Sequence, residues 1–192
     1  MATVISDKGQ ASNPYLHKIR LVRGDITGQE VDAIVSLLPP SLDFTGSINK
    51  ALLNKAGQQL DEFVLENMYQ PKAGDIYAVP AFDLPCRNIL FSVRPPWRSD
   101  FEREDKHLVI CVRKAMVLAK CMLLPKIAFP PLASGKKGFP KQRAARLLIQ
   151  GIIDRLDEQS GEIRIVCPDD ETGRIYKERL TSAGWRGHGN NE

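Results

Sequence analysis

Short apolar runs, separated by turn-forming residues and by longer segments with helical spacing, recur along the chain. Continuous apolar runs predict strands that are buried on both faces, and apolar side chains three and four residues apart predict helices. The runs predict strands over residues 17–23, 33–38, 76–79, 88–93, 127–129 and 162–167. The helical spacing predicts helices over residues 48–56, 60–68, 102–124, 141–156 and 169–182. Strands alternate with helices after the first pair, which is typical of an α/β protein.

Proline, glycine and serine mark several of the predicted boundaries. Pro39 and Pro40 end the second strand, because neither can donate a hydrogen bond to a neighbouring strand. Ser47 is a plausible N-cap for the first helix, and Gly57 ends that helix. Pro140 suits the first position of a helix, where its preset φ is helical and no N–H is needed.

The length of the chain predicts a single domain. The sequence has 192 residues, enough to bury a sizeable core, and shows neither a linker nor an internal repeat. We expect a flexible N-terminal segment over residues 1–16, one folded domain over 17–183 and a polar tail over 184–192.

Composition and charge exclude little beyond a membrane span. Hydrophobic residues make up 43% of the chain and charged residues 26%, as in ordinary globular proteins. The net charge of +4 is compatible with a phosphate-bearing ligand or with weak nucleic-acid contact, but selects neither. No apolar run approaches the length of about 18 residues that a membrane helix needs, and the N-terminus has no signal-peptide core. We therefore expect a protein without membrane contact.

The four cysteines predict buried thiols rather than a metal site. No Cys-x-x-Cys pair occurs, and the three histidines are scattered, so we expect neither metal nor cofactor. Cys111, Cys121 and Cys167 lie within apolar patterns, which favours burial. A reduced, cytoplasmic setting follows.

Residues 126–140 combine a short apolar run, a glycine-containing loop and a helix start. This order is how an α/β protein builds an anion site, because loop N–H groups and the positive end of the helix dipole face the same space. Lys136 and Lys137 add positive charge. The alternative is a tight turn with two solvated lysines. Neither a Gly-x-Ser-x-Gly elbow nor a P-loop motif is present.

Several short stretches, taken together and in order, resemble the macro domain. They are Gly24-Asp25-Ile26-Thr27, Val31-Asp32-Ala33-Ile34-Val35, Ala56-Gly57, Ile127-Ala128-Phe129-Pro130, Ser134-Gly135 and Gly138-Phe139-Pro140. The resemblance runs from about Ile19 to Cys167. It implies a three-layer α/β/α sandwich around a mixed, mostly parallel sheet, with a cleft for ADP-ribose at the strand ends.

The resemblance also implies the ligand-binding residues. Asp25, with the Ile26 backbone beside it, takes the place of the residue that accepts a hydrogen bond from the adenine amino group. The alternative is that Asp25 only makes a turn with Gly24. A second set takes the place of the pyrophosphate loop, with Phe139 expected against the distal ribose: Ser134, Gly135, Lys136, Lys137, Gly138 and Phe139.

The other half of the expected cleft departs from the family pattern. Ser36, Leu37, Leu38 and Pro39 stand where the family has an Asn-Ala-Ala-Asn run. Phe44, Thr45, Gly46 and Ser47 replace the glycine-rich loop; Gly46, Ser47 and Ile48 still offer an anion site at a helix start. Asn49 replaces an acid that activates water in hydrolytic members, and an amide cannot act as a general base. Arg94 replaces a glycine and either pairs with a phosphate or is a solvated charge.

These departures favour binding over catalysis. We expect a module that binds ADP-ribose, a related adenine nucleotide or ADP-ribosylated protein, without the usual hydrolase residues. One alternative is an ADP-ribosyl hydrolase with a rearranged site. No catalytic residue is assigned; the candidates by position alone are Asp43, Asn49, Lys136 and Lys137. The other alternative is a nucleic-acid-binding or structural domain, for which charge is supplied by Lys136, Lys137, Arg143 and Arg146.

Overall fold

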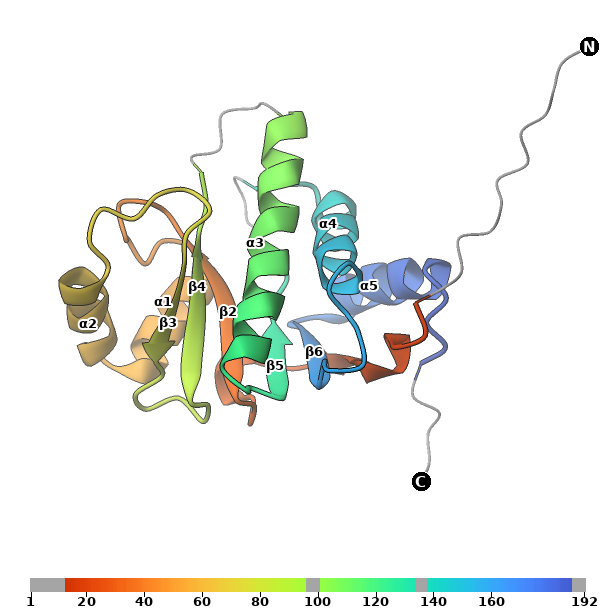
Figure 1. Ribbon diagram of the computed structural model, residues 1–192, viewed down its shortest axis with the longest axis horizontal. Helices are drawn as coiled ribbons and strands as arrows, with labels where there is room; N and C mark the ends of the chain where they lie inside the picture. The colour runs from red at the N-terminus through yellow and green to blue at the C-terminus, as the bar shows by residue number, and fades with distance from the viewer. Residues whose placement is uncertain (1–12, 96–100, 134–137, 188–192) are drawn as a thin grey trace, which may run out of the picture.

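The computed structural model describes residues 13–95, 101–133 and 138–187, and six strands within them form one sheet (Figure 1). The strands are β1 (Ile19–Arg23), β2 (Ala33–Leu38), β3 (Ile76–Pro80), β4 (Asn88–Val93), β5 (Lys126–Phe129) and β6 (Glu162–Cys167). The helices are α1 (Ser47–Ala56), α2 (Gln59–Asn67), α3 (Phe101–Cys121), α4 (Lys141–Ile153) and α5 (Asp170–Ser182). Two short 3₁₀ helices, η1 (Leu16–Lys18) and η2 (Ile26–Gly28), flank β1.

The sheet is mixed and mostly parallel, as the sequence predicts. Its strand order is β1-β6-β5-β2-β4-β3. All neighbouring pairs are parallel except β3 and β4, which are antiparallel. The carboxyl ends of β1, β2, β4, β5 and β6 therefore lie along one edge of the sheet.

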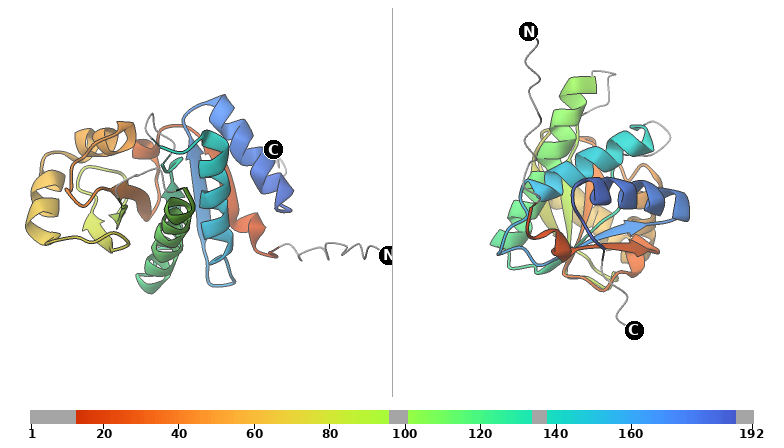
Figure 2. Two further views of the ribbon diagram at one scale, coloured as in Figure 1. Left: turned by 90° about the horizontal axis from the view of Figure 1, so that it is seen from above. Right: turned by 90° about the vertical axis from the view of Figure 1, so that its right-hand side faces the viewer.

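Two apolar clusters, one on each face of the sheet, make the molecule a three-layer α/β/α sandwich (Figures 1 and 2). One cluster joins the sheet to α3, α4 and α5, and includes Val112, Leu148 and Tyr176. The other joins it to α1 and α2, and includes Leu52 and Val64. Alternating side chains of each buried strand enter the two clusters, which explains why the strands are continuously apolar.

Several predicted boundaries move by a few residues. A 3₁₀ turn occupies Leu16–Lys18, so the first strand begins at Ile19 rather than at residue 17. Gly46 and not Ser47 is the N-cap of α1, with φ +88° and no side-chain capping bond. Pro140 is likewise the N-cap of α4 and not its first residue. Helix α3 ends at Cys121 because Leu123 adopts φ +53° and turns the chain.

The folded part extends beyond the predicted domain limits at both ends. The Asn13 side chain donates to the backbone oxygens of Ile153 (3.2 Å) and Leu156 (2.9 Å), and Leu16 is buried. Trp185 is buried too, and its indole N–H donates to the Ile19 backbone oxygen at 2.9 Å. The segment predicted as a polar tail therefore has a core residue, Trp185, at its second position. Trp185 packs and hydrogen-bonds in the core instead of offering a stacking surface.

The cysteines are free thiols, and one of them contradicts the predicted burial. Cys111 and Cys167 are buried, whereas Cys121 is exposed at the end of α3. No group of three or more His, Cys, Asp and Glu residues that could hold a metal ion occurs in the described part of the chain. Among the described helices, none is long and apolar enough to cross a membrane.

Candidate ligand-binding site

The predicted ligand-binding segments follow parallel strands and gather at the carboxyl-end edge of the sheet. Asp25 and Ile26 follow β1, Gly46 to Ile48 follow β2, and Gly138 and Phe139 are the described residues of the segment after β5. In open α/β sheets this edge is where ligands bind. The short helix η2, which begins at Ile26, also contacts α1, so the first two segments are neighbours.

Asp25 caps η2 through its side chain. One carboxylate oxygen accepts from the Thr27 backbone N–H at 2.9 Å, and the other accepts from the Thr27 hydroxyl at 2.8 Å. Asp25 is exposed, while Ile26 and Thr27 are buried. The turn that the sequence suggested is present, and it holds the carboxylate in a fixed orientation with lone pairs toward solvent. The turn role and a ligand role are compatible.

The start of α1 offers backbone N–H groups to solvent. Gly46 and Ser47 are exposed, and the first N–H groups of a helix have no partner within the helix. The φ of Gly46, +88°, is one that L side chains rarely adopt, and a Cβ there would meet no atom within 4 Å. The glycine is therefore required by backbone conformation, and the space above the helix start is open.

The segment between β2 and α1 is pinned by two apolar side chains that sequence reasoning overlooked. Leu42 and Phe44 are buried, and the Phe44 ring meets Phe91 of β4 edge-on, with ring centroids 5.7 Å apart. Asp43 between them is exposed. A phenylalanine between polar residues of a predicted loop is the signal that would have indicated such an anchor. Because Phe44 anchors the segment, it lacks the freedom of a triple-glycine loop.

Asn49 is buried, and its side chain is engaged inside the protein. Its side-chain N–H₂ donates to the Leu37 backbone oxygen (2.8 Å) and to the Thr45 backbone oxygen (3.2 Å). Its side-chain oxygen accepts from the Ser36 hydroxyl at 2.7 Å. Only 6% of the residue is exposed. The side chain ties α1 to the end of β2, which is a structural task.

Part of the predicted phosphate loop lies outside the described residues, namely Ser134, Gly135, Lys136 and Lys137. At the base of the loop, the Phe139 N–H donates to the Ala133 backbone oxygen at 2.8 Å. Gly138 is exposed, whereas Phe139 is 5% exposed and belongs to the core cluster. In this conformation Phe139 therefore has little surface to offer a ribose.

Arg143 supports the base of this loop. Its guanidinium carbon lies 5.3 Å from the centre of the Phe139 ring, and its Nε donates to an Asp105 oxygen at 2.8 Å. Arg146 donates to the other Asp105 oxygen at 3.2 Å. Sequence reasoning missed this contact, although the four-residue spacing of Phe139 and Arg143 across a helix start would have indicated it.

Arg94 and Cys167 stand at the same edge, whereas Cys86 precedes β4 and lies toward the opposite edge. The Arg94 backbone N–H donates to the Leu38 oxygen at 2.9 Å, and partial burial lowers the pKa of its guanidinium. The Arg94 charge is thus partly buried beside the end of β2. Burial raises the pKa of the Cys167 thiol to about 12, and that of Cys86 to about 11. Neither cysteine is a thiolate nucleophile at neutral pH.

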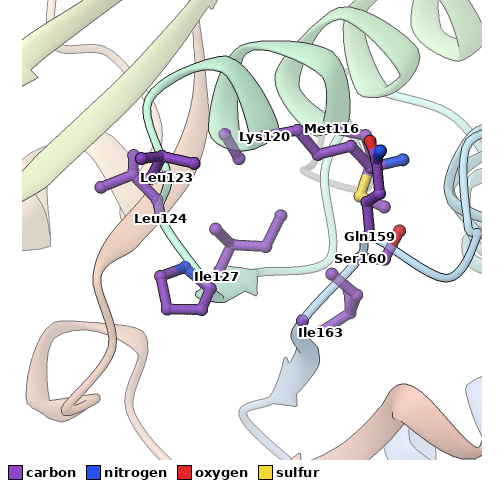
Figure 3. Close-up of a pocket in the computed structure, with 11 residues that line it drawn as sticks. Met116, Lys120, Leu123, Leu124, Ile127, Gln159, Ser160 and Ile163 are labelled. Carbon is purple, nitrogen blue, oxygen red and sulfur yellow. The ribbon is translucent and has the colours of Figure 1, made fainter.

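A separate pocket of about 230 Å³ lies at the opposite edge of the sheet (Figure 3). It is formed by the end of α3, the amino ends of β5 and β6, and the connection that precedes β6. Met116, Ile127 and Ile163 are among its buried apolar lining residues. This pocket contains none of the predicted ligand-binding residues.

Comparison with known proteins identifies relatives over most of the chain. A Listeria monocytogenes protein named macro domain-containing protein LMOf2365_2748 is 33% identical over 172 residues, which are 86% of this chain and 98% of that protein. O-acetyl-ADP-ribose deacetylase of Salmonella typhimurium is 28% identical over 172 residues, 87% of this chain and 96% of that protein. A Thermotoga maritima protein is 32% identical over 171 residues, but these span only 28% of its length.

Solved structures agree in fold. The Oceanobacillus iheyensis macrodomain with ADP matches with a TM-score of 0.78 and 30% identity, over 84% of this chain and 89% of that chain. A variant of that macrodomain with ADPR matches with a TM-score of 0.76, also at 30% identity, over 84% of this chain and 91% of that chain. Residues 40–148 match the family described as Macro domain. This protein belongs to the macro domain family.

Proposed function

We propose that this protein binds ADP-ribose, or an ADP-ribosyl group on another molecule, at the carboxyl-end edge of its sheet. The observation that carries the proposal is the capped turn at Asp25, which lies beside the open start of α1 on that edge. A relative at 30% identity has been solved with ADP in the same fold.

The adenine end of the ligand is assigned to the turn. The Asp25 carboxylate accepts a hydrogen bond from the exocyclic amine of adenine, a contact that guanine cannot provide at that position. The two bonds from Thr27 hold the carboxylate in place before the ligand arrives, which reduces the entropy lost on binding.

The diphosphate is assigned to two backbone sites. The N–H groups of Ser47 and Ile48 at the start of α1 supply one, helped by the helix dipole. Residues 134–138 supply the other, with the charges of Lys136 and Lys137. Phe139 belongs to this site as the fixed base of the loop, held by Arg143.

Binding without hydrolysis is the finer part of the proposal. The position that would need an acid holds Asn49, whose amide atoms are engaged with Leu37, Thr45 and Ser36. A buried amide in such a network neither takes up a proton nor orients water. Asp43 is an exposed carboxylate nearby and is the residue to test if turnover is found.

The rival function with a specific observation behind it is ester hydrolysis, because relatives at 28% identity are named O-acetyl-ADP-ribose deacetylase. Incubation with O-acetyl-ADP-ribose separates the two functions. We expect no release of acetate above the rate without protein. Release that is lost in Asp43→Asn would replace binding by hydrolysis as the function.

Nucleic-acid binding is less well supported, because Arg143 and Arg146 both bond to Asp105 and their charge is partly balanced.

Calorimetry with ADP-ribose tests the main proposal. We expect binding to the wild type, and affinity reduced about 10- to 100-fold in Asp25→Ala, since a hydrogen bond to a charged group contributes about 1.5–3 kcal/mol. Thr27→Val removes only the hydroxyl bond to the carboxylate and keeps its charge, so it should reduce the affinity less than Asp25→Ala does. Folded wild-type protein that binds no ADP-ribose at millimolar ligand would disprove the proposal.

A further inference from the structure

The first turn of α4 carries positive charge where a helix normally carries negative charge. Lys141 and Arg143 lie in this turn, and no acidic residue does. The N–H dipoles at a helix start favour anions and oppose cations, so the helix alone does not favour an arginine there. Arg143 therefore needs a partner outside its own helix. Asp105 of α3 is such a partner, and the two helices lie side by side in Figures 1 and 2.

Asp105 holds two arginines of α4 with one carboxylate. Its two oxygens accept from Arg143 at 2.8 Å and from Arg146 at 3.2 Å. The Asp105 and Arg143 side chains are only 20% and 27% exposed, so this pair is shielded more than an ordinary surface ion pair. Because Arg143 and Arg146 are three residues apart and lie on the same side of α4, the carboxylate restrains the helix start as well as the Arg143 side chain.

Arg143 passes this restraint to the base of the loop after β5. Its guanidinium lies over the ring of Phe139, which is 5% exposed. The Phe139 N–H in turn donates to the Ala133 backbone oxygen at 2.8 Å. Ala133 has a φ of +59°, which alanine rarely adopts and which persists only where surrounding contacts enforce it. The described ends of the loop are thus joined by a hydrogen bond whose donor residue is packed by Arg143.

Charge alone does not explain an acid at this place. Asp105 meets the start of α4 at the carboxyl-end edge, where the diphosphate is proposed to bind, and a carboxylate repels a phosphate. A second aspartate–arginine pair between the same helices provides the contrast. Asp154, at the end of α4, bonds to Arg113 of α3. The rise of the helix from Arg143 to Asp154 is about 16 Å, so this second pair lies away from the ligand edge.

We propose that Asp105 is a positioning residue for the binding of ADP-ribose. It acts through Arg143 and Phe139, by holding the base of the loop after β5 in its binding arrangement, and it does not touch the ligand. The inference rests on the proposed function and adds to it a residue of α3. Loss of the carboxylate should therefore weaken binding, whereas the loss of a repelling charge alone would strengthen it.

Calorimetry with ADP-ribose measures the first consequence. We expect Asp105→Ala to reduce the affinity about 3- to 30-fold, which is the range for residues that act on a ligand through others. Asp105→Asn keeps an oxygen for the Arg143 Nε and should lose less. Asp154→Ala is the matched control, because it removes the same charge and also breaks a pair between α3 and α4. Its affinity should equal that of wild type.

Hydrogen exchange of the Phe139 amide, measured without ligand, tests the second consequence. The N–H that bonds to Ala133 should exchange about tenfold faster or more in Asp105→Ala, and at the wild-type rate in Asp154→Ala. This rate does not depend on ADP-ribose, so it tests the hold on the loop base separately from the identity of the ligand. Circular dichroism establishes that each variant is folded.

Two results would overturn the inference. Unchanged or tighter ADP-ribose binding by folded Asp105→Ala would mean that the carboxylate acts by charge or not at all. An unchanged exchange rate of the Phe139 amide in that variant would mean that Asp105 does not hold the loop base. Failure of the proposed function has a different signature. Wild type then gives no heat with ADP-ribose, which also removes a role of Asp105 in that binding, while faster exchange in Asp105→Ala still identifies the hold on the loop base.

Discussion

The Asn49 side chain meets a donor on its oxygen side and two acceptors on its N–H₂ side, and these partners determine what an acid could do there. Its N–H₂ group faces the backbone oxygens of Leu37 and Thr45 at 2.8 and 3.2 Å. In Asn49→Asp a carboxylate oxygen would replace that donor and oppose both carbonyls. We expect the substitution to lower the free energy of unfolding by about 2–3 kcal/mol at pH 7. We also expect it to confer no hydrolase activity, because the carboxylate remains buried.

The pH dependence of Asn49→Asp has a definite sign. Burial and the two carbonyls raise the pKa of the new carboxyl group above its unfolded value. Between the unfolded and the folded pKa of this group, the folded state binds more protons than the unfolded state. The stability of the variant therefore falls as the pH rises through that range, and it recovers on acidification. Urea unfolding at pH 5 and pH 8 measures this; Asn49→Ala is the control, with no such slope. A variant as stable as wild type at pH 8, or one that hydrolyses the ester, would contradict the burial argument.

Glu162 gives a pH effect of the opposite sign. Partial burial acts to raise the pKa of its carboxyl group, but the hydrogen bond and charge of Arg164 and the charge of Arg20 outweigh burial and lower it. A lowered pKa means that the contribution to stability is present above the unfolded value of about 4.5 and is lost as the pH falls through the folded value.

We therefore expect Glu162→Gln to lower the free energy of unfolding by up to about 1 kcal/mol at pH 7, since the pairs are only partly buried. The difference from wild type should vanish progressively below about pH 4.5. Denaturant unfolding across pH 3–7 tests this. A difference that is constant with pH would mean that packing, rather than charge, is what the substitution removes.

Single residues mark the limits of what the sequence predicts about the site. Asp25 could be placed in a turn from Gly24-Asp25-Ile26-Thr27, because a cap is a local interaction. The burial of Phe44 against Phe91, and of Phe139 beneath Arg143, depends on strands far apart in the sequence. Asn49 could be identified as an amide where an acid is usual, but its three internal partners could not.

At the scale of elements, the crossing of α3 and α4 depends on one glycine. A Cβ at Gly151 would lie 2.7 Å from the Val112 Cβ and 3.2 Å from the Val109 backbone oxygen. Gly173 in α5 is also helical, but its nearest such atom is the Cys167 Cβ at 4.0 Å. The same substitution should therefore have opposite effects in the two helices.

We expect Gly151→Ala to lower the free energy of unfolding by about 1–3 kcal/mol, because the helices must separate or repack. Gly173→Ala should raise it by about 0.5–1 kcal/mol through helix propensity. Guanidinium unfolding of both variants beside wild type measures the difference. If both variants change stability in the same direction, close packing at the α3–α4 crossing is not what requires the glycine.

The strands were more predictable than the helix ends. The bounds of β2, β4 and β6 match the apolar runs 33–38, 88–93 and 162–167, because turn residues enclose each run. The end of α3 was placed three residues too far, at 124 instead of Cys121. Leu123 and Leu124 continue the apolar pattern, and the left-handed turn at Leu123 has no glycine to announce it.

At the scale of the whole molecule, the two edges of the sheet are distinct. The described residues of the predicted ligand segments lie at the carboxyl ends of the strands, and the pocket beside Leu123 lies at the amino ends of β5 and β6. Binding at one edge therefore does not compete directly for the other. The free energy of unfolding responds to binding at either edge, because a ligand that binds only the folded state stabilises it by mass action.

ADP-ribose at 100 times its dissociation constant should raise the free energy of unfolding by about 2.7 kcal/mol. For a domain of this size that corresponds to an increase in Tm of about 5–11 °C. Asp25→Asn, which keeps a side-chain oxygen for the Thr27 N–H, should have nearly the wild-type Tm without ligand and a smaller increase with it. GDP-ribose is the matched control ligand, because guanine lacks the amine that Asp25 is proposed to accept from. Equal increases with the two ligands would mean that this carboxylate does not select the base, and would leave the diphosphate as the main source of affinity.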